Sequence, residues 1–351
     1  KINNLLLYKI KPSKKVNINI CIFITFSKER SNIIIMTVFI PKKVYLTIVA
    51  ASVRFANLKI PQDDWLEVSG IFIGKNEGEH VFISEAYPIM HQELDKNAVI
   101  DQYKWSDEDY EALYIIDDEA FAHGEFTVGW WHSHPGFKVM MSHIDIKTTL
   151  SYQTNNQLAI SLVFNPMRLL KQIELPNKKG DPVKQLKNDP GFKIFRLDDV
   201  NRGIEASYHT VDYKVNDYES MEQLVASTQK FIIDVTKLFP KDKIDEVYAK
   251  FVKERINKLN SLLLGTEEYL MTLVRKGESN RIPEVLRNQT NDIRNYVAKT
   301  FIKIENIKEY MNYLEYKERD IIIPKIEGIL AEWDENVSKL NDKLTQISKK
   351  F

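Results

Sequence analysis

The residues with the clearest potential for chemistry are two histidines and an aspartate that lie close together in the sequence. His132 and His134 are separated by one serine, and Asp145 follows after a Pro-Gly pair. On a β-strand, residues two apart point to the same face, so both imidazoles can reach one ion. The Pro-Gly pair breaks the strand and lets the chain turn back, so that an aspartate one turn into the next helix can join them. Three such ligands leave a fourth tetrahedral position for water, which is typical of catalytic zinc.

A site of this kind also needs a group that moves protons without binding the metal, and Glu67 is the best candidate. Glu67 begins a β-like run beside the small residues Ser69 and Gly70. A carboxylate near a zinc-activated water can take its proton and later give it to a leaving amine. Thiolate-rich zinc sites are excluded, because the only cysteine is Cys21. A single thiol fits a reducing compartment, so we expect a cytoplasmic protein, or a nuclear one if the source is a eukaryote.

Each of these residues also has a simpler structural explanation. A lone His-x-His can be a pair of surface residues on a strand, and Glu67 alone would be an ordinary carboxylate at a strand end. Ser142 is a natural helix N-cap, and Asp145, three residues later, would complete a capping box. The presence of all these residues together favours the metal site over chance, and Ser142 can serve both as a cap and in chemistry.

Composition narrows the remaining classes of function. The chain has 351 residues, of which 44% are hydrophobic and 28% charged, an ordinary globular composition with enough apolar residues for a core. Lysine plus arginine and aspartate plus glutamate balance at 49 each. Nucleic-acid binders usually carry a basic excess, so no nucleic-acid partner is expected. No segment is apolar over the length that a membrane span needs, so no membrane partner is expected either.

Hydrophobic periodicity predicts an α/β (α+β) domain over residues 36–200. The predicted helices are 47–58, 106–123 and 142–153, and the predicted strands are 67–74, 80–86, 126–131, 158–164 and 192–197. The second helix has Ser106 as its N-cap with Asp109 at the third helical position. Residues 192–197 are expected to be the last strand, and Trp130 and Trp131 are expected to alternate between core and surface.

The two ends of the chain differ from this domain. Apolar stripes at helical spacing, such as Val252, Ile256, Leu259 and Leu263, predict a C-terminal helical arm over residues 201–351. Residues 1–35 are rich in Ile, Asn and Lys, and the first methionine is Met36. We expect residues 1–35 to be a disordered leader or translated sequence upstream of the true start, with a signal peptide as the alternative.

The quoted residues resemble a known family. The run Glu67-Val-Ser-Gly-Ile-Phe-Ile-Gly74 is similar to the glutamate-bearing strand of the JAMM/MPN+ metalloproteases, and His132-Ser-His-Pro followed by Ser142-x-x-Asp145 matches their signature. The resemblance is strongest to the branch that includes the deubiquitinating subunit of the proteasome lid and the deneddylating subunit of the signalosome. It implies an MPN-type, cytidine-deaminase-like sheet flanked by helices and followed by a long helical arm.

The resemblance also implies roles and partners. One Zn²⁺ per chain would be held by His132, His134 and Asp145, Glu67 would be the acid/base, and Ser142 would stabilise the oxyanion. The substrate would be an isopeptide bond between lysine and the tail of ubiquitin or a ubiquitin-like protein. The tail would bind in extended form beside an insertion at about 91–110, and a second insertion at about 168–190 would approach the substrate or a partner. Residues 201–351 would dock an MPN-domain or helical-bundle subunit.

Two other functions stay open at this stage. The first is a non-catalytic MPN scaffold subunit of a multi-subunit complex, although such relatives lose the histidines or the glutamate that this sequence keeps. The second is a zinc hydrolase of a sulfur-carrier-type conjugate, against which the long helical arm argues, because a small-molecule enzyme has less need of a docking platform.

Overall fold

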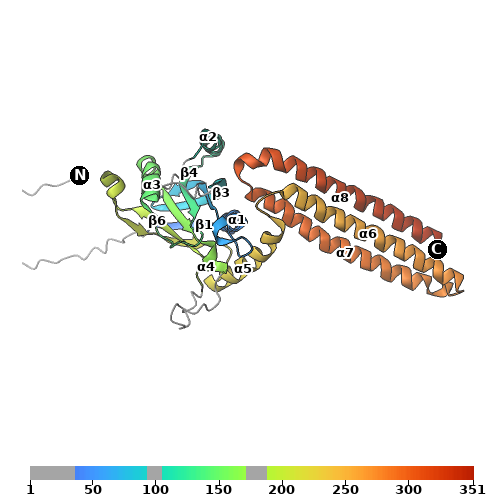
Figure 1. Ribbon diagram of the computed structural model, residues 1–351. Helices are drawn as coiled ribbons and strands as arrows, with labels where there is room; N and C mark the ends of the chain where they lie inside the picture. The colour runs from blue at the N-terminus through green and yellow to red at the C-terminus, as the bar shows by residue number, and fades with distance from the viewer. Residues whose placement is uncertain (1–35, 93–104, 171–187) are drawn as a thin grey trace, which may run out of the picture. The chain divides into compact units, whose positions relative to one another are not determined.

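Among the residues that the structure describes, a mixed sheet of eight strands organises the first part of the chain. The computed structural model describes residues 36–92, 105–170 and 188–351 (Figure 1). The strands are β1 (Thr37–Ile40), β2 (Glu67–Glu77), β3 (His80–Gln92), β4 (Phe126–Ser133), β5 (Ile160–Phe164), β6 (Phe192–Leu197), β7 (Tyr208–Thr210) and β8 (Asp212–Val215). Their order across the sheet is β7-β6-β5-β4-β2-β3-β1-β8. The central strand β4 pairs antiparallel with β2 and parallel with β5.

Helices cover both faces of the sheet, so the domain has three layers (Figure 1). The main core packs α1 (Lys42–Phe55) and α5 (Met221–Leu238) against one face, where Phe72 and Trp131 are fully buried. The opposite face carries α2 (Asp107–Phe121) and α3 (His143–Asn155) over two smaller apolar clusters. The short α4 (Pro166–Leu170) follows β5. The predicted fold class, a sheet flanked by helices and followed by a helical region, is therefore confirmed.

Local sequence signals place most of these elements correctly. Ser106 and Asp109 form the predicted capping box at the start of α2, with the Asp109 amide donating to Ser106 Oγ at 3.2 Å. Helix α1 begins earlier and ends earlier than residues 47–58. It begins directly after Pro41, and it ends where the side chain of Asn57 donates to the Val53 carbonyl at 2.8 Å and so competes with the helical hydrogen bonds.

Two predictions about the sheet are wrong. Residues 192–197 are not the last strand, because the short strands β7 and β8 follow and pair with the two opposite edges of the sheet. Trp130 and Trp131 do alternate between faces, but neither reaches the surface, since helices cover both faces and the two side chains are 1% and 0% exposed. In each case the pairing of distant segments decided the outcome.

The second part of the chain is helical from α5 onward. The long helices α6 (Ile244–Arg275), α7 (Ile282–Tyr310) and α8 (Tyr316–Lys350) pack along one another (Figure 1). The predicted stripe on α6 is buried, with Val252 1% and Leu259 3% exposed. Among the described helices, none is long and apolar enough to cross a membrane.

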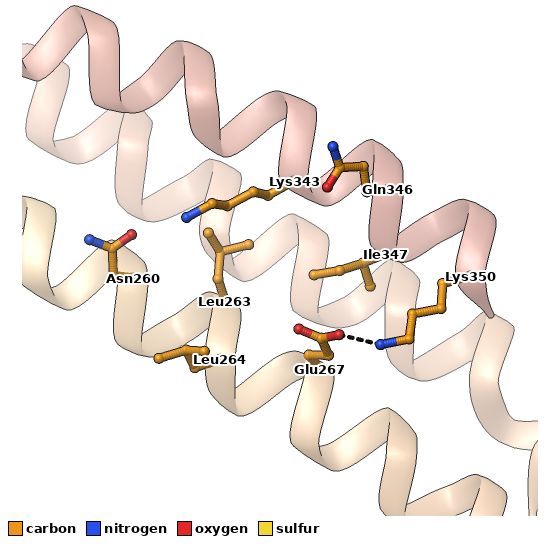
Figure 2. Close-up of a pocket in the computed structure, with 8 residues that line it drawn as sticks. All are labelled: Asn260, Leu263, Leu264, Glu267, Lys343, Gln346, Ile347 and Lys350. Atoms are coloured by element: carbon orange, nitrogen blue, oxygen red, sulfur yellow. Dashed lines mark hydrogen bonds and ion pairs between the residues drawn. The ribbon is translucent and has the colours of Figure 1, made fainter.

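A groove of about 550 Å³ lies between α6 and α8 (Figure 2). Leu263, Leu264 and Ile347 form its apolar part, and Glu267 pairs with Lys350 across it at 2.5 Å. Because no residue of this groove belongs to the predicted metal site, the two features are separate.

Several predictions concern residues outside this description. Residues 1–35 are not described, nor are the central parts of both expected insertions, 93–104 and 171–187. The division into domains at residues 36–200 and 201–351 stays a prediction. The sheet itself continues past residue 200, through β7 and β8.

Candidate metal centre

Strand β4 and the residue that follows it deliver both histidines to one side of the sheet. The pairing of β4 with β5 ends at Ser133, and the amide of His134 continues it by donating to the Phe164 carbonyl at 2.7 Å. His132 and His134 therefore keep the alternation of an extended strand and lie on the same face. Both are buried, at 1% and 8% exposed.

A tight turn ends the strand directly after the second histidine. The Phe137 amide donates to the His134 carbonyl at 3.2 Å, and Gly136 has a φ of 83°. Proline followed by a positive-φ glycine at the two central positions is the composition of a type II turn. Asn165 fastens the turn by donating from its side chain to the Phe137 carbonyl at 2.6 Å. The turn thus reverses the chain toward α3.

The first turn of α3 orients the aspartate. The Asp145 amide donates to Ser142 Oγ at 3.2 Å, and the Ser142 amide donates to Asp145 Oδ2 at 2.6 Å. These reciprocal bonds make the predicted capping box. They hold the carboxylate at the helix N-terminus, where negative charge is favoured. Asp145 is 5% exposed.

The three side chains meet with the spacing that a small cation requires. His132 Nε2 lies 2.9 Å from His134 Nε2 and 3.1 Å from Asp145 Oδ1, and His134 Nε2 lies 3.6 Å from Asp145 Oδ2. Tetrahedral zinc with bonds of 2.0–2.1 Å would separate its ligands by ~3.3 Å. The observed spacings bracket that value, and this is the one group of potential metal ligands found among the described residues. Two imidazoles and a carboxylate are a donor set that zinc accepts, so the residues fit the ion.

The electrostatics favour the metal-binding protonation states. Burial alone raises the pKa of Asp145, but the charge and hydrogen bond of His132 and the Ser142 amide outweigh it and lower the pKa to about 2. Burial, and next the neighbouring His132, lower the pKa of His134. At neutral pH the carboxyl group is therefore ionised and the His134 imidazole is neutral. These are the forms that a metal ion needs.

Residues around the ligands orient their rings. His134 Nδ1 lies 3.0 Å from the Lys138 carbonyl, an acceptor that leaves Nε2 facing the other ligands. The Trp130 ring stacks on the His132 ring at 4.5 Å and 6°, and Trp130 Nε1 donates to Thr149 Oγ1 at 3.1 Å. The sequence predicted neither the contact of Trp130 with His132 nor any contribution of Thr149. The position of Trp130, two residues before His132 on the strand, is the signal that places it on the same face.

Glu67 lies on the strand next to the histidines. In the antiparallel register of β2 and β4, Ser69 pairs with His132, and the Val68 amide donates to Ser133 Oγ at 2.9 Å. Glu67, two residues before Ser69, therefore shares the face of the two imidazoles at the end where His134 lies. Its side chain is half-buried and is not one of the three grouped ligands.

The predicted site residues thus fall into two sets. His132, His134 and Asp145 are brought into contact with one another, and Ser142 is tied to Asp145 by the capping box. Glu67 is placed beside them by the sheet. Ser142 itself is an exposed residue.

Comparison with known proteins adds a family. Residues 34–157 match the family model described as JAB1/Mov34/MPN/PAD-1 ubiquitin protease. This range contains all five predicted site residues.

Individual relatives agree with this match. The chain is 31% identical over 105 residues to COP9 signalosome complex subunit 5 of Drosophila melanogaster, which covers 29% of this chain and 31% of the relative. It is 30% identical over 152 residues to COP9 signalosome complex subunit 5a of Arabidopsis thaliana, and this match covers 42% of this chain and 41% of the relative. It is 24% identical over 163 residues to 26S proteasome non-ATPase regulatory subunit 14 of Caenorhabditis elegans, and this match covers 42% of this chain and 49% of the relative. The matched segments span less than half the length of each relative.

Proposed function

We propose, from the premise that residues 34–157 form a domain of the JAB/MPN family, that this chain is a zinc-dependent isopeptidase. The bond cleaved would join a lysine to the C-terminal tail of ubiquitin or a ubiquitin-like protein. The observation that carries the proposal is the meeting of His132, His134 and Asp145 on the sheet face that Glu67 shares. A scaffold without activity has no need of this arrangement.

Each residue has a chemical role in this proposal. His132, His134 and Asp145 hold one zinc ion. When bound, zinc supplies a Lewis acid for the scissile carbonyl and lowers the pKa of a water toward about 7. Glu67 accepts a proton from the attacking water and delivers it to the departing lysine amine, which would otherwise be a poor leaving group.

Ser142 is placed to stabilise negative charge. Its Oγ accepts a hydrogen bond from the Asp145 amide, so the hydroxyl proton can be donated to the oxygen that becomes charged during attack. The capping interaction holds the Ser142 Oγ in place before substrate arrives. Preorganisation of this kind lowers the cost of reorienting donors during the reaction.

Partner proteins belong to the proposal as well. Several relatives are named as subunits of the COP9 signalosome or the 26S proteasome. We therefore propose that residues 201–351 dock an MPN-domain or helical-bundle subunit. The exposed apolar side chains Leu264, Phe301 and Ile302 on α6 and α7 support a role of this region in assembly.

The decisive experiment is a substrate panel with and without chelator. The full chain, purified and checked for zinc by metal analysis, is incubated with isopeptide-linked conjugates of ubiquitin and of ubiquitin-like proteins. We expect cleavage of at least one conjugate, its loss when zinc is removed, and its recovery when zinc is returned, because zinc is the Lewis acid in the proposed mechanism. Stoichiometric zinc with no cleavage of any conjugate would instead support a scaffold function.

A further inference from the structure

The first turn of α8 makes polar side-chain contacts with three elements of the sheet domain. Glu315, Lys317 and Glu318, here called the α8 N-terminal cluster, carry these contacts. Glu315 Oε1 lies 2.8 Å from Nδ1 of His91 on β3, and Lys317 Nζ lies 3.3 Å from Oδ1 of Asp109 on α2. The Glu318 carboxylate accepts two hydrogen bonds from Arg54 on α1, at 2.6 and 2.7 Å. Residues far apart in the sequence thus converge on one helical turn.

The contact with α1 is buried rather than a surface ion pair. The Arg54 side chain is 3% exposed, and it also donates to the carbonyls of Pro240 at 3.0 Å and Lys241 at 2.9 Å. Its guanidinium lies over the ring of Phe239 at 4.9 Å. A buried guanidinium whose donors are used in this way fixes the geometry of what it joins.

The contact with β3 is also buried on the α8 side. The Glu315 side chain is 2% exposed, and its second oxygen, Oε2, has no hydrogen-bond partner in the described part of the chain. The His91 ring stacks on the Phe55 ring at 4.3 Å and 18°. The Glu315 side chain also takes part in the capping box at the start of α8. A buried carboxylate with so few partners favours the position in which those partners are held.

The residues held in this way flank Glu67. In the antiparallel register of β2 and β3, Gln92 is opposite Glu67 and His91 is opposite Val68. Directly before Glu67 in the chain, the Leu66 amide donates to the Phe55 carbonyl at 3.3 Å. The α8 N-terminal cluster therefore acts on the sheet face behind Glu67, while Glu67 itself faces the histidines.

We infer that the α8 N-terminal cluster positions Glu67 for proton transfer, so that the metal site depends on how α8 is held. Glu315 and Glu318 are positioning residues in this inference, which rests on the proposed isopeptidase function. Because α8 extends from this turn along α6 and α7, a protein partner bound to these helices can regulate the site by shifting the turn.

The test uses Glu315→Gln in the full chain, with Glu335→Gln as its matched control. Glu335 lies on the same helix, is 64% exposed and pairs with Lys339 at the surface, 2.6 Å away. For Glu315→Gln we expect unchanged zinc content and about tenfold faster amide hydrogen exchange in peptides that cover residues 66–69 and 88–92. We also expect kcat on an isopeptide substrate to fall about ten- to hundredfold with KM unchanged, because Glu67 is misplaced rather than removed. The control is expected to match the wild type.

His91→Gln provides a second variant in case Glu315→Gln does not fold. The His91 side chain is 29% exposed, so its replacement disturbs the core less than that of Glu315. The double variant with Glu315→Gln is expected to lose no more activity than either single change, since both remove one contact. Unchanged exchange and unchanged kcat in these variants would overturn the inference, and so would loss of zinc or faster exchange across the whole sheet. If wild type and control both lack activity, the proposed function fails, while the exchange result still decides whether the cluster positions the strand.

Discussion

Asp145 serves both the helix and the candidate site. Oδ2 accepts the Ser142 amide in the capping box and lies 3.6 Å from His134 Nε2, while Oδ1 faces His132 Nε2 at 3.1 Å. The capping interpretation and the ligand interpretation of this residue are therefore compatible. The capping bonds set the orientation of the carboxylate before any cation binds, which lowers the conformational entropy lost on binding.

At the scale of single residues, Glu67→Gln separates proton transfer from metal binding. Glutamine has nearly the same shape but cannot accept a proton at neutral pH, so we expect activity to fall by about 10²–10⁴-fold while zinc is retained. Isopeptide cleavage and metal analysis of the same preparation measure the two effects. His132→Ala is expected to lose the zinc. The control is His143→Ala, which changes an exposed histidine next to Ser142 and should keep both the zinc and the activity. Wild-type activity in Glu67→Gln would remove Glu67 from the mechanism.

At the scale of elements, the candidate site depends on how closely β4 approaches β5. Gly129 lies three residues before His132 and has a φ of 155°. A Cβ at this position would lie 2.2 Å from the Ile160 carbonyl oxygen. The backbone of β5 therefore leaves no room for a side chain, and the strand that carries the histidines requires glycine at this point.

We accordingly predict that Gly129→Ala lowers the free energy of unfolding by about 2–4 kcal/mol and lowers zinc occupancy, because both strain and the β4–β5 pairing are affected. Urea unfolding followed by circular dichroism measures the first effect. Gly265→Ala on α6 is the matched control, since a Cβ there meets nothing within 4 Å. Alanine favours a helix more than glycine does, so the control should be unchanged or more stable by about 0.5–1 kcal/mol. Equal stability of both variants would contradict the steric account.

At the scale of the whole described chain, α1 and α8 are joined by a buried ion pair. Arg54 bonds Glu318 and two backbone carbonyls at the α5–α6 connection. Arg54 therefore joins α1, the α5–α6 connection and the first turn of α8. Its neighbour Phe55 accepts a hydrogen bond from the Leu66 amide, which extends these contacts to the residues before Glu67. Removing the guanidinium would take two donors from the Glu318 carboxylate, which keeps the Glu315 amide at 3.2 Å, and one donor from each of the two carbonyls.

We expect Arg54→Met to lower the free energy of unfolding by about 3–5 kcal/mol, because breaking a buried pair leaves the opposite charge uncompensated. Adding Glu318→Met should restore part of this loss, since an apolar pair no longer buries a lone charge. Lys308→Met, which removes an exposed pair on α7, should cost no more than about 0.5 kcal/mol. Urea unfolding curves of the three variants give the comparison. If Arg54→Met lowers the free energy of unfolding as little as Lys308→Met does, the Arg54–Glu318 ion pair contributes little to stability.

The sequence by itself determined the features that depend on short-range rules. The period of two along a strand predicted that His132 and His134 share a face, and the Ser142-x-x-Asp145 spacing predicted a capping box at the start of α3. These predictions succeeded because alternation along a strand and capping involve only neighbouring residues. The helix predicted from the apolar stripe that begins at Val252 was also correct, since 3.6-residue periodicity is local.

Tertiary structure alone decided the features that depend on long-range pairing. The placement of Glu67 beside the histidines required the register of β2 on β4, and β7 and β8 became strands only because the sheet edges paired with them. The contacts of Arg54 with Glu318 and of His91 with Glu315 join residues 264 and 224 positions apart. No local pattern predicts such partners, because which charges are buried together is set by the packing of whole elements rather than by their own propensities.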